Sequence, residues 1–198
     1  MKLQRSFYEE HPVEVIAKKL LGKHLVTCFS GEKTSGLITE VEAYSGRNDK
    51  ACHANNGLRT GRTEVMYSEG GKAYVYLCYG IHHMLNVVTS PQGLADAVLI
   101  RSIQPIEGIE VMFRRRGFES MSKRLTSGPG NVGKALGLNT QMHNGADLLS
   151  DQIWIEERPD LLKENIISTK RIGIDYAEED ALKPWRFYIK DSKWVSKK

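Results

Sequence analysis

The sequence predicts a single α+β domain, spanning residues 1–198 and built around a mainly antiparallel β-sheet. Three observations favour this class. Segments with the composition of strands outnumber those with the periodicity of helices. Most neighbouring strand candidates are separated by short turn-forming stretches, as in hairpins, which is typical of α+β proteins. No internal repeat, low-complexity tract or linker divides the chain, and a chain of this length buries roughly 70% of its unfolded surface.

The N-terminal part begins with a predicted helix over residues 12–21 (PVEVIAKKLL), with Pro12 in its first turn and Gly22 just beyond its end. Residues 24–29 and 37–44 predict a hairpin, joined by a turn over residues 30–36 (SGEKTSG). The polar, glycine-rich stretch that follows, residues 45–72, predicts a long loop, and loops of this length are usually functional or disordered. One face of the helix should pack against the sheet, through Val13, Ile16, Ala17, Leu20 and Leu21.

The rest of the sequence alternates between strands and short helices. Residues 72–79 and 84–89 predict a second hairpin, which turns at Gly80. Residues 106–116 predict a helix that ends at Gly117 and carries three arginines in its last turn, where positive charge favours the helix dipole. Residues 127–138 predict another short helix. Further strands are expected at residues 95–103, 152–157, 170–175 and 185–190.

The charge balance and the cysteine content limit the possible environments. The chain has 28 lysines and arginines against 24 aspartates and glutamates, and its net charge of +4 is compatible with a polyanionic partner without requiring one. Three widely spaced cysteines without a CxxC motif argue against a disulfide framework and favour a reducing compartment. The N-terminus lacks the apolar core of a signal peptide, and no run of about 18 apolar residues is present. We therefore expect a soluble, cytoplasmic protein with no membrane partner.

Two motifs suggest chemistry that their details do not support. Residues 128–134 spell G-x-x-x-x-G-K, but Ala135 follows where a nucleotide-binding P-loop needs a hydroxyl group for magnesium. A glycine-rich helix start is the better interpretation, and its free N–H groups could still meet a nucleic-acid phosphate. The cysteines and histidines lack the close ligand spacing of zinc modules, so we expect no metal at Cys52, His53, Cys78, His82 or His83.

The strand candidate LITEVEAY, residues 37–44, presents Glu40, Glu42 and Tyr44 on one face, because alternate residues of a strand point the same way. Glu40 and Glu42 would lie ~7 Å apart, a spacing found between carboxylates that cleave glycosidic bonds. The alternative is that both glutamates are solvated, which is the commoner outcome for an arbitrary strand. Tyr44, followed by a long histidine-bearing loop, favours a water-activating carboxylate beside a stacked substrate.

The segment AYVYLCYGIHHMLN, residues 73–86, contains three tyrosines. Tyr74 and Tyr76 share one face of their strand, whereas Tyr79 lies on the other face, next to Gly80 at the predicted tip. Core packing explains a tyrosine at a hairpin end poorly. Exposed aromatic rings on a mildly basic protein suit stacking on nucleic-acid bases or wedging between them. From these residues alone, core filling and base stacking are equally good interpretations.

Together these segments resemble the alkyladenine (3-methyladenine) DNA glycosylase family, of the type also found in mammals. The resemblance is collinear over nearly the whole chain, and it implies a curved sheet with surrounding helices and a protruding β-hairpin. The absence of a long N-terminal extension fits a bacterial member. The matching segments are ITEVEAYSGRNDKACH (38–53), MYSEGGKAYVYLCYGIHHMLNVV (66–88), AVLIRSIQPIEG (97–108), LTSGPGNVGKALGLN (125–139), KRIGID (170–175) and KPWRFYI (183–189).

The resemblance implies catalytic roles for three residues. Glu42 corresponds to the general base that activates the attacking water. Arg101 matches an arginine that helps to hold this water, and the backbone carbonyl of Ile172 would hold its other side. No lysine occupies a matched nucleophile position, so the resemblance implies a monofunctional glycosylase that needs no cofactor and leaves an abasic site.

The resemblance also implies a binding site for a damaged purine extruded from double-stranded DNA. Tyr44, His53 and Tyr76 match residues that sandwich the flipped base, and Asn86 matches an asparagine that screens purines in the pocket. Tyr79 matches a side chain that fills the gap left in the duplex.

Two other functions use some of the same residues. A non-catalytic nucleic-acid-binding module would use the same tyrosines and basic surface but would not release a base. A nucleotide triphosphatase would use residues 128–134. His82 and His83 match no role in the family, and no obligate protein partner is evident.

Overall fold

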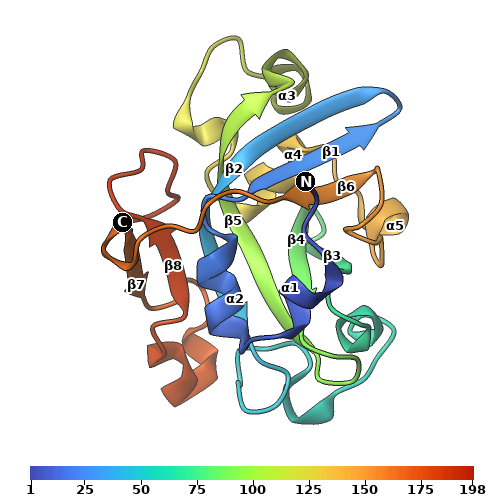
Figure 1. Ribbon diagram of the computed structural model, residues 1–198, viewed down its shortest axis with the longest axis vertical. Coiled ribbons are helices and arrows are strands. Elements are labelled where there is room, and N and C mark those ends of the chain that lie inside the picture. The colour runs from blue at the N-terminus through green and yellow to red at the C-terminus, as the bar shows by residue number, and fades with distance from the viewer.

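Eight strands form one sheet in the computed structural model, which describes residues 1–198 (Figure 1). The sheet order is β3-β4-β5-β2-β1-β6, and β8 pairs with both β2 and β7. All of these pairings are antiparallel, which confirms the predicted α+β class and its mainly antiparallel sheet. The strands are β1 (His24–Phe29), β2 (Glu32–Tyr44), β3 (Ala73–Cys78), β4 (His82–Thr89), β5 (Asp96–Glu107), β6 (Ile153–Glu156), β7 (Ile166–Thr169) and β8 (Arg186–Ile189).

Short helices surround this sheet. The α-helices are α1 (Arg5–Glu9), α2 (Val13–Leu20), α3 (Ile109–Arg116), α4 (Pro129–Ala135) and α5 (Thr140–His143). The 3-10 helices are η1 (Asn55–Gly57), η2 (Glu64–Tyr67), η3 (Lys123–Leu125), η4 (Lys163–Asn165) and η5 (Asp175–Leu182). None of the helices has the length and apolar character needed to cross a membrane.

The central strand β2 is long enough to take two partners along one of its edges. Its first part, Glu32–Leu37, pairs with β1, whereas Glu40–Glu42 pair with β8. β5 follows the opposite edge, and the register shifts on both sides of Glu40. Such bulges bend a strand and increase its twist, so β2 should bend at the point where the predicted carboxylates lie.

The turn between β1 and β2 is shorter than predicted. Only Ser30 and Gly31 connect the strands, and Phe29 pairs directly with Glu32. Both turn residues have positive φ, at 51° and 80°, as in the type I′ turns that match the twist of a hairpin. The predicted seven-residue turn is therefore wrong, because the polar residues after Gly31 continue the ladder.

Residues 170–175 were predicted as a strand, and this prediction is wrong. β7 ends at Thr169, and the chain then forms a loop in which Gly173 has a φ of 76°. The backbone N–H of Ile172 donates to the carboxylate of Glu42 instead of pairing with a strand. The β-forming composition of this segment is therefore overridden by contacts with residues ~130 positions away, as tertiary packing can override local preference.

The hairpin of β3 and β4 protrudes from the sheet. β4 pairs with β3 from His82 onwards, but it pairs with β5 only over Asn86–Thr89. The outer half of the hairpin therefore has no sheet neighbour beyond β4. Its tip is apolar and exposed, with Leu77, Tyr79 and Ile81 at 44%, 91% and 72% exposure.

The main core lies between the sheet and its helices. The predicted apolar face of residues 12–21 is confirmed, since all five of its side chains are buried. Gly117, at a φ of 68°, ends α3 as predicted, although β5 occupies residues 106–107 and the helix starts at Ile109. On α4, a side chain at Gly133 would overlap the backbone oxygen of His83, so this glycine permits close packing against the hairpin.

Candidate active site

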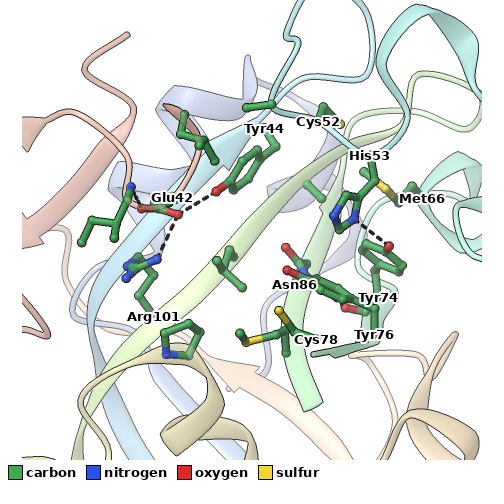
Figure 2. Close-up of a pocket in the computed structure, with 18 of the residues that line it drawn as sticks. Glu42, Tyr44, Cys52, His53, Met66, Tyr74, Tyr76, Cys78, Asn86 and Arg101 are labelled. Atoms are coloured by element: carbon green, nitrogen blue, oxygen red, sulfur yellow. Dashed lines mark hydrogen bonds and ion pairs between the residues drawn. The ribbon is translucent and has the colours of Figure 1, made fainter. Parts of the chain in front are cut away.

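A cavity of about 500 Å³ opens where β2, β3, β4 and β5 meet the loops that follow β2 and β7 (Figure 2). Twenty-two residues line it, most of them apolar or aromatic, as is typical of small-molecule and cofactor sites. The structure brings all the predicted site residues together in this lining: Glu42, Tyr44, His53, Tyr76, Tyr79, Asn86, Arg101 and Ile172.

Glu42 is completely buried at the wall of this cavity, so it is not the solvated glutamate of the alternative interpretation. Three donors hold its carboxylate. The hydroxyl of Tyr44 donates to Oε2 at 2.7 Å, Arg101 Nη1 donates to the same oxygen at 3.2 Å, and the N–H of Ile172 donates to Oε1 at 2.8 Å. Hydrogen bonds of this kind, between ionised partners or to a carboxylate, are the stronger ones in proteins and fix geometry.

Glu40 is equally buried but does not line the cavity. The structure thus contradicts the idea that the two carboxylates act as a pair across a substrate. Burial alone would raise the pKa of Glu40, but Arg101, Ser196 and Arg186 together hold this pKa below its usual value. Glu40 therefore stays anionic as part of a buried ion-pair network.

An aromatic wall faces Glu42 across the cavity (Figure 2). The rings of Tyr74 and Tyr76 stack with centroids 5.4 Å apart, and His53 meets Tyr76 edge-on at 4.8 Å. His53 Nδ1 lies 3.0 Å from the hydroxyl of Tyr74. On the opposite side, burial and the neighbouring carboxylate of Glu42 raise the pKa of Tyr44 well above its usual value, so its hydroxyl keeps its proton and donates a hydrogen bond to Glu42.

Arg62 is a cavity residue that the sequence patterns did not indicate. Its guanidinium lies 4.8 Å from the ring centroid of Tyr76, and Nη2 is 3.1 Å from Nε2 of His53. Because arginine can only donate, Nε2 of His53 must accept, and its proton is then on Nδ1, directed at Tyr74. Burial, reinforced by the charge of Arg62, lowers the pKa of His53 to about 4, so this imidazole is neutral near pH 7.

A second feature missed at the sequence level is the buried ion pair of Asp49 and Arg171. Its two hydrogen bonds measure 2.5 and 2.7 Å, and both side chains are fully buried. The guanidinium also lies over the ring of Tyr44, 4.7 Å from its centroid, and donates to the carbonyl of Ala43. The pair therefore joins the loop after β2 to the loop that carries Ile172. Because the two residues are distant in the sequence, no local sequence pattern indicates that they pair.

The hairpin contributes Asn86 and Tyr79 to the cavity. Asn86 is buried, and its Nδ2 donates to the carbonyl of Tyr74 across the hairpin, which orients the amide. Tyr79, in contrast, is 91% exposed and has a φ of 51°, an unusual conformation for a bulky residue. Strain of this kind is often found at functional positions.

His82 and His83 pack the hairpin against neighbouring helices. His83 Nδ1 accepts the N–H of Thr140, the first residue of α5, at 3.1 Å. A side chain at Gly130 of α4 would come within 2.7 Å of the ring of His82. These contacts give both histidines a structural role, and they show that Gly130 and Gly133 pack against the hairpin.

Comparisons with known proteins identify the family of this chain. The model of the methylpurine-DNA glycosylase family matches residues 6–193. Relatives that carry the provisional name 3-methyladenine DNA glycosylase include proteins of Alkaliphilus oremlandii, 48% identical over 100% of both chains, and Clostridium acetobutylicum, 48% identical over 99% of this chain and 98% of the relative. A third, from Chlamydia felis, is 49% identical over 98% of this chain and all of its own. The chain therefore belongs to the methylpurine-DNA glycosylase family, as its motifs predict.

Proposed function

We propose that this protein is a monofunctional DNA glycosylase of base-excision repair, which flips alkylated or deaminated purines out of double-stranded DNA and hydrolyses their N-glycosidic bond. The observation that carries the proposal is the buried carboxylate of Glu42, held by three donors at one side of a cavity whose other side is an aromatic wall. Family membership supports the same chemistry.

The cavity suits a flat, extruded base. Flipping a nucleotide costs a few kcal/mol of stacking and pairing, and this cost is least for damaged bases. Tyr44 and the ring pair of His53 and Tyr76 would sandwich the base, and a positively charged alkylated purine gains further from electron-rich rings. Asn86 is oriented by its hydrogen bond to the carbonyl of Tyr74, and it is the residue proposed to select among purines at the edge of the base. Tyr79 would enter the gap left in the duplex, as apolar wedges do in other minor-groove binders.

Hydrolysis then requires a water molecule near the sugar carbon. Glu42 would accept a proton from this water and stabilise the positive charge that develops on the sugar as the base leaves. Arg101 and the backbone carbonyl of Ile172 are the proposed supports of the water. The cavity lining offers carboxylate, guanidinium, imidazole and phenol groups but no lysine amine, which supports direct hydrolysis to an abasic site.

The decisive variant is Glu42→Gln, which keeps the size of the side chain but removes the base. We expect it to lower the single-turnover rate of purine release by at least about 100-fold, the usual contribution of a general base. Binding to a duplex with a stable abasic-site analogue should persist. Release is measured as free base from methylated duplex DNA and from a duplex that contains one hypoxanthine.

Glu32→Gln is the matched control, because Glu32 lies at the far end of the same strand and outside the cavity. Release at the normal rate by the Glu42→Gln variant would show that another group is the base. A wild-type protein that binds damaged DNA and releases no purine would favour the non-catalytic binding module.

A further inference from the structure

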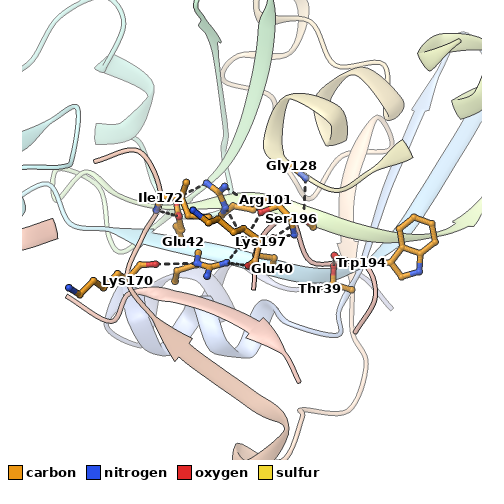
Figure 3. Close-up of polar contacts among 12 residues, drawn as sticks. Thr39, Glu40, Glu42, Arg101, Gly128, Lys170, Ile172, Trp194, Ser196 and Lys197 are labelled. Carbon is orange, nitrogen blue, oxygen red and sulfur yellow. Dashed lines mark hydrogen bonds and ion pairs between the residues drawn. The ribbon is translucent and has the colours of Figure 1, made fainter. Parts of the chain in front are cut away.

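The carboxylate of Glu40 is buried in the middle of β2 and has no part in the proposed hydrolysis. Its oxygens accept hydrogen bonds from five donor groups, which come from β5, from β8 and from the segment that follows β8 (Figure 3). The donors are Arg101 Nε at 3.1 Å, Arg186 Nη1 at 2.8 Å, Ser102 Oγ at 2.9 Å, and the N–H and Oγ of Ser196 at 2.7 and 2.9 Å. Every oxygen lone pair of a carboxylate can be satisfied by such a set.

Arg101 is the one member of this network that also contacts Glu42. Its Nε donates to Glu40, while its Nη1 donates to Glu42. The guanidinium is a rigid plane, so fixing the direction of one N–H also fixes the others. Glu40 thus determines where Arg101 points within the cavity.

Arg186 balances the charge of the network, and its side chain makes no hydrogen bond to Glu42, although the two residues are opposite each other on β8 and β2. Besides Glu40, it donates to the backbone carbonyls of Lys170 and Lys197. Two carboxylates and two guanidiniums therefore form a neutral buried group. Without Arg186, Glu40 and Glu42 would share a single cation.

Residues 194–197 complete this network from outside the sheet. The hydroxyl of Thr39 donates to the carbonyl of Trp194 at 2.7 Å, and Trp194 itself is buried, so the segment is held against β2. Ser196 then turns both its N–H and its hydroxyl toward Glu40. The family match ends at residue 193, so Ser196 lies beyond the matched range.

We propose that Glu40, with its coordination completed by Ser196, is a positioning residue that holds Arg101 in the orientation needed to support Glu42 and the attacking water. This inference rests on the proposed glycosylase function. Glu40 touches neither the base nor the water, and it acts only through Arg101.

The test compares single-turnover release of hypoxanthine from duplex DNA by the wild type and four variants. Glu40→Gln keeps the shape but loses the charge that binds Arg101. We expect its rate to fall by about 10- to 100-fold, as small misplacements of catalytic groups can cause, while its affinity for DNA is unchanged. Ser196→Ala removes one of the five bonds to Glu40 and the 3.5 Å contact from Arg101 Nη2 to the same hydroxyl. We expect a smaller fall, of about threefold to tenfold, that remains measurable if Glu40→Gln does not fold.

Two controls separate positioning from stability. Arg186→Gln breaks the same buried network, but it removes no side-chain hydrogen bond to Arg101 or Glu42. It should therefore lower thermal stability as Glu40→Gln does, with a smaller loss of rate per folded molecule. Glu107→Gln alters a partly exposed ion pair with Lys33 on the neighbouring strand and should change neither property.

The pH dependence of the release rate distinguishes positioning from a purely structural role, because a purely structural role would leave this dependence unchanged. The charged and titratable groups near Glu42 are Glu40 and Tyr44 from β2, Arg101 from β5, Tyr76 from β3, Arg186 from β8 and Arg171 from the loop after β7. Replacing the anion of Glu40 by an amide removes one negative charge from the buried group of two carboxylates and two guanidiniums, and a less negative environment disfavours the uptake of a proton. The acid side of the rate profile of Glu40→Gln should therefore move to lower pH.

The outcomes are distinguishable. If the wild type releases no purine from any substrate, the proposed function fails and this inference fails with it. If the wild type is active and Glu40→Gln and Ser196→Ala both match it, the positioning role is refuted. The role is also refuted if Glu40→Gln and Arg186→Gln lose rate equally, in proportion to their loss of folded protein, with an unchanged pH profile.

Discussion

At the scale of single residues, neighbours decide what a side chain can do. Glu40 and Glu42 are two residues apart on one strand and both are fully buried. Glu42 borders the cavity and has three donors, whereas Glu40 is enclosed by two arginines and two serines. One carboxylate is thus available for chemistry and the other is not.

His53 makes a prediction about stability and pH at this scale. Burial, with the charge of Arg62, lowers its pKa from 6.5 to about 4 in the folded protein. The unfolded chain takes up a proton as the pH falls through about 6.5, whereas the folded protein resists until about pH 4. The stability contributed by neutral His53 is therefore complete above pH 6.5 and is lost as the pH falls toward 4.

The variant His53→Gln should remove this dependence. The groups that face His53 are Tyr74 and Tyr76 of β3 and Arg62 of the preceding loop, and none of these titrates in this interval. Urea unfolding at several pH values between 7 and 5 should show a steeper loss of stability for the wild type than for the variant. Parallel curves would mean that His53 titrates normally.

At the scale of elements, the β3–β4 hairpin combines exposure with strain. Its tip carries Tyr79 at a φ of 51°, where a residue with a side chain is disfavoured by roughly 1–2 kcal/mol. At 91% exposure, the ring contributes little packing in the free protein. The proposed wedge role would give a reason for a tyrosine at this position.

The substitution Tyr79→Gly should therefore separate stability from activity. Relief of strain is offset in part by the greater freedom of glycine in the unfolded chain, so we expect a melting temperature that stays level or rises by up to about 3 °C. Purine release from duplex DNA should fall by about tenfold or more, since base stacking contributes ~1–3 kcal/mol.

The matched control is Ser30→Gly, because Ser30 has the same φ of 51° in the β1–β2 turn, at the other end of the sheet from the cavity lining. It should change the melting temperature to a similar extent and leave purine release intact. Full activity of the Tyr79→Gly variant on duplex DNA would exclude the proposed role of Tyr79 as a wedge.

At the scale of the whole molecule, the pair of Asp49 and Arg171 connects parts of the chain that form the cavity. Arg171 reaches Asp49, the carbonyl of Ala43 and the carbonyl of Asp180. It thereby ties the end of β2, the start of the loop with His53 and the C-terminal η5 to one another. The two sides of the cavity, about 120 residues apart in sequence, depend on this link.

Removing one charge of this pair should destabilise the protein as a whole. Asp49→Asn leaves Arg171 as a buried cation without its partner, which costs about 3–5 kcal/mol. For a chain of this size that corresponds to a fall in melting temperature of roughly 6–20 °C. Calorimetry measures it, with Asp151→Asn as the control, because Asp151 forms an ion pair at the surface and should have no effect. Equal melting temperatures for the two variants would contradict the structural role of the buried pair.

Much of the fold followed from patterns between near neighbours. The apolar face of α2, the turn at Gly80, the end of α3 at Gly117 and the strands of both hairpins depend on residues a few positions apart, so the sequence predicts them. The site residues required more than spacing. The alternation of side chains along a strand placed Glu42 and Tyr44 on the same face, but this alternation cannot distinguish a buried carboxylate from a solvated one.

What the sequence determined by itself was the α+β class, the family and the eight site residues that the family motifs match, because residue periodicity and collinear motifs depend only on the order of residues along the chain. The tertiary structure decided the rest. It placed Arg62 over Tyr76, made residues 170–174 a loop, and enclosed Glu40 while leaving Glu42 at the cavity. These outcomes depend on hydrogen bonds, ion pairs and stacking between residues that are mostly distant in the chain. The energies of such contacts exceed the local secondary-structure preferences of the residues, and only these local preferences can be recognised in the sequence.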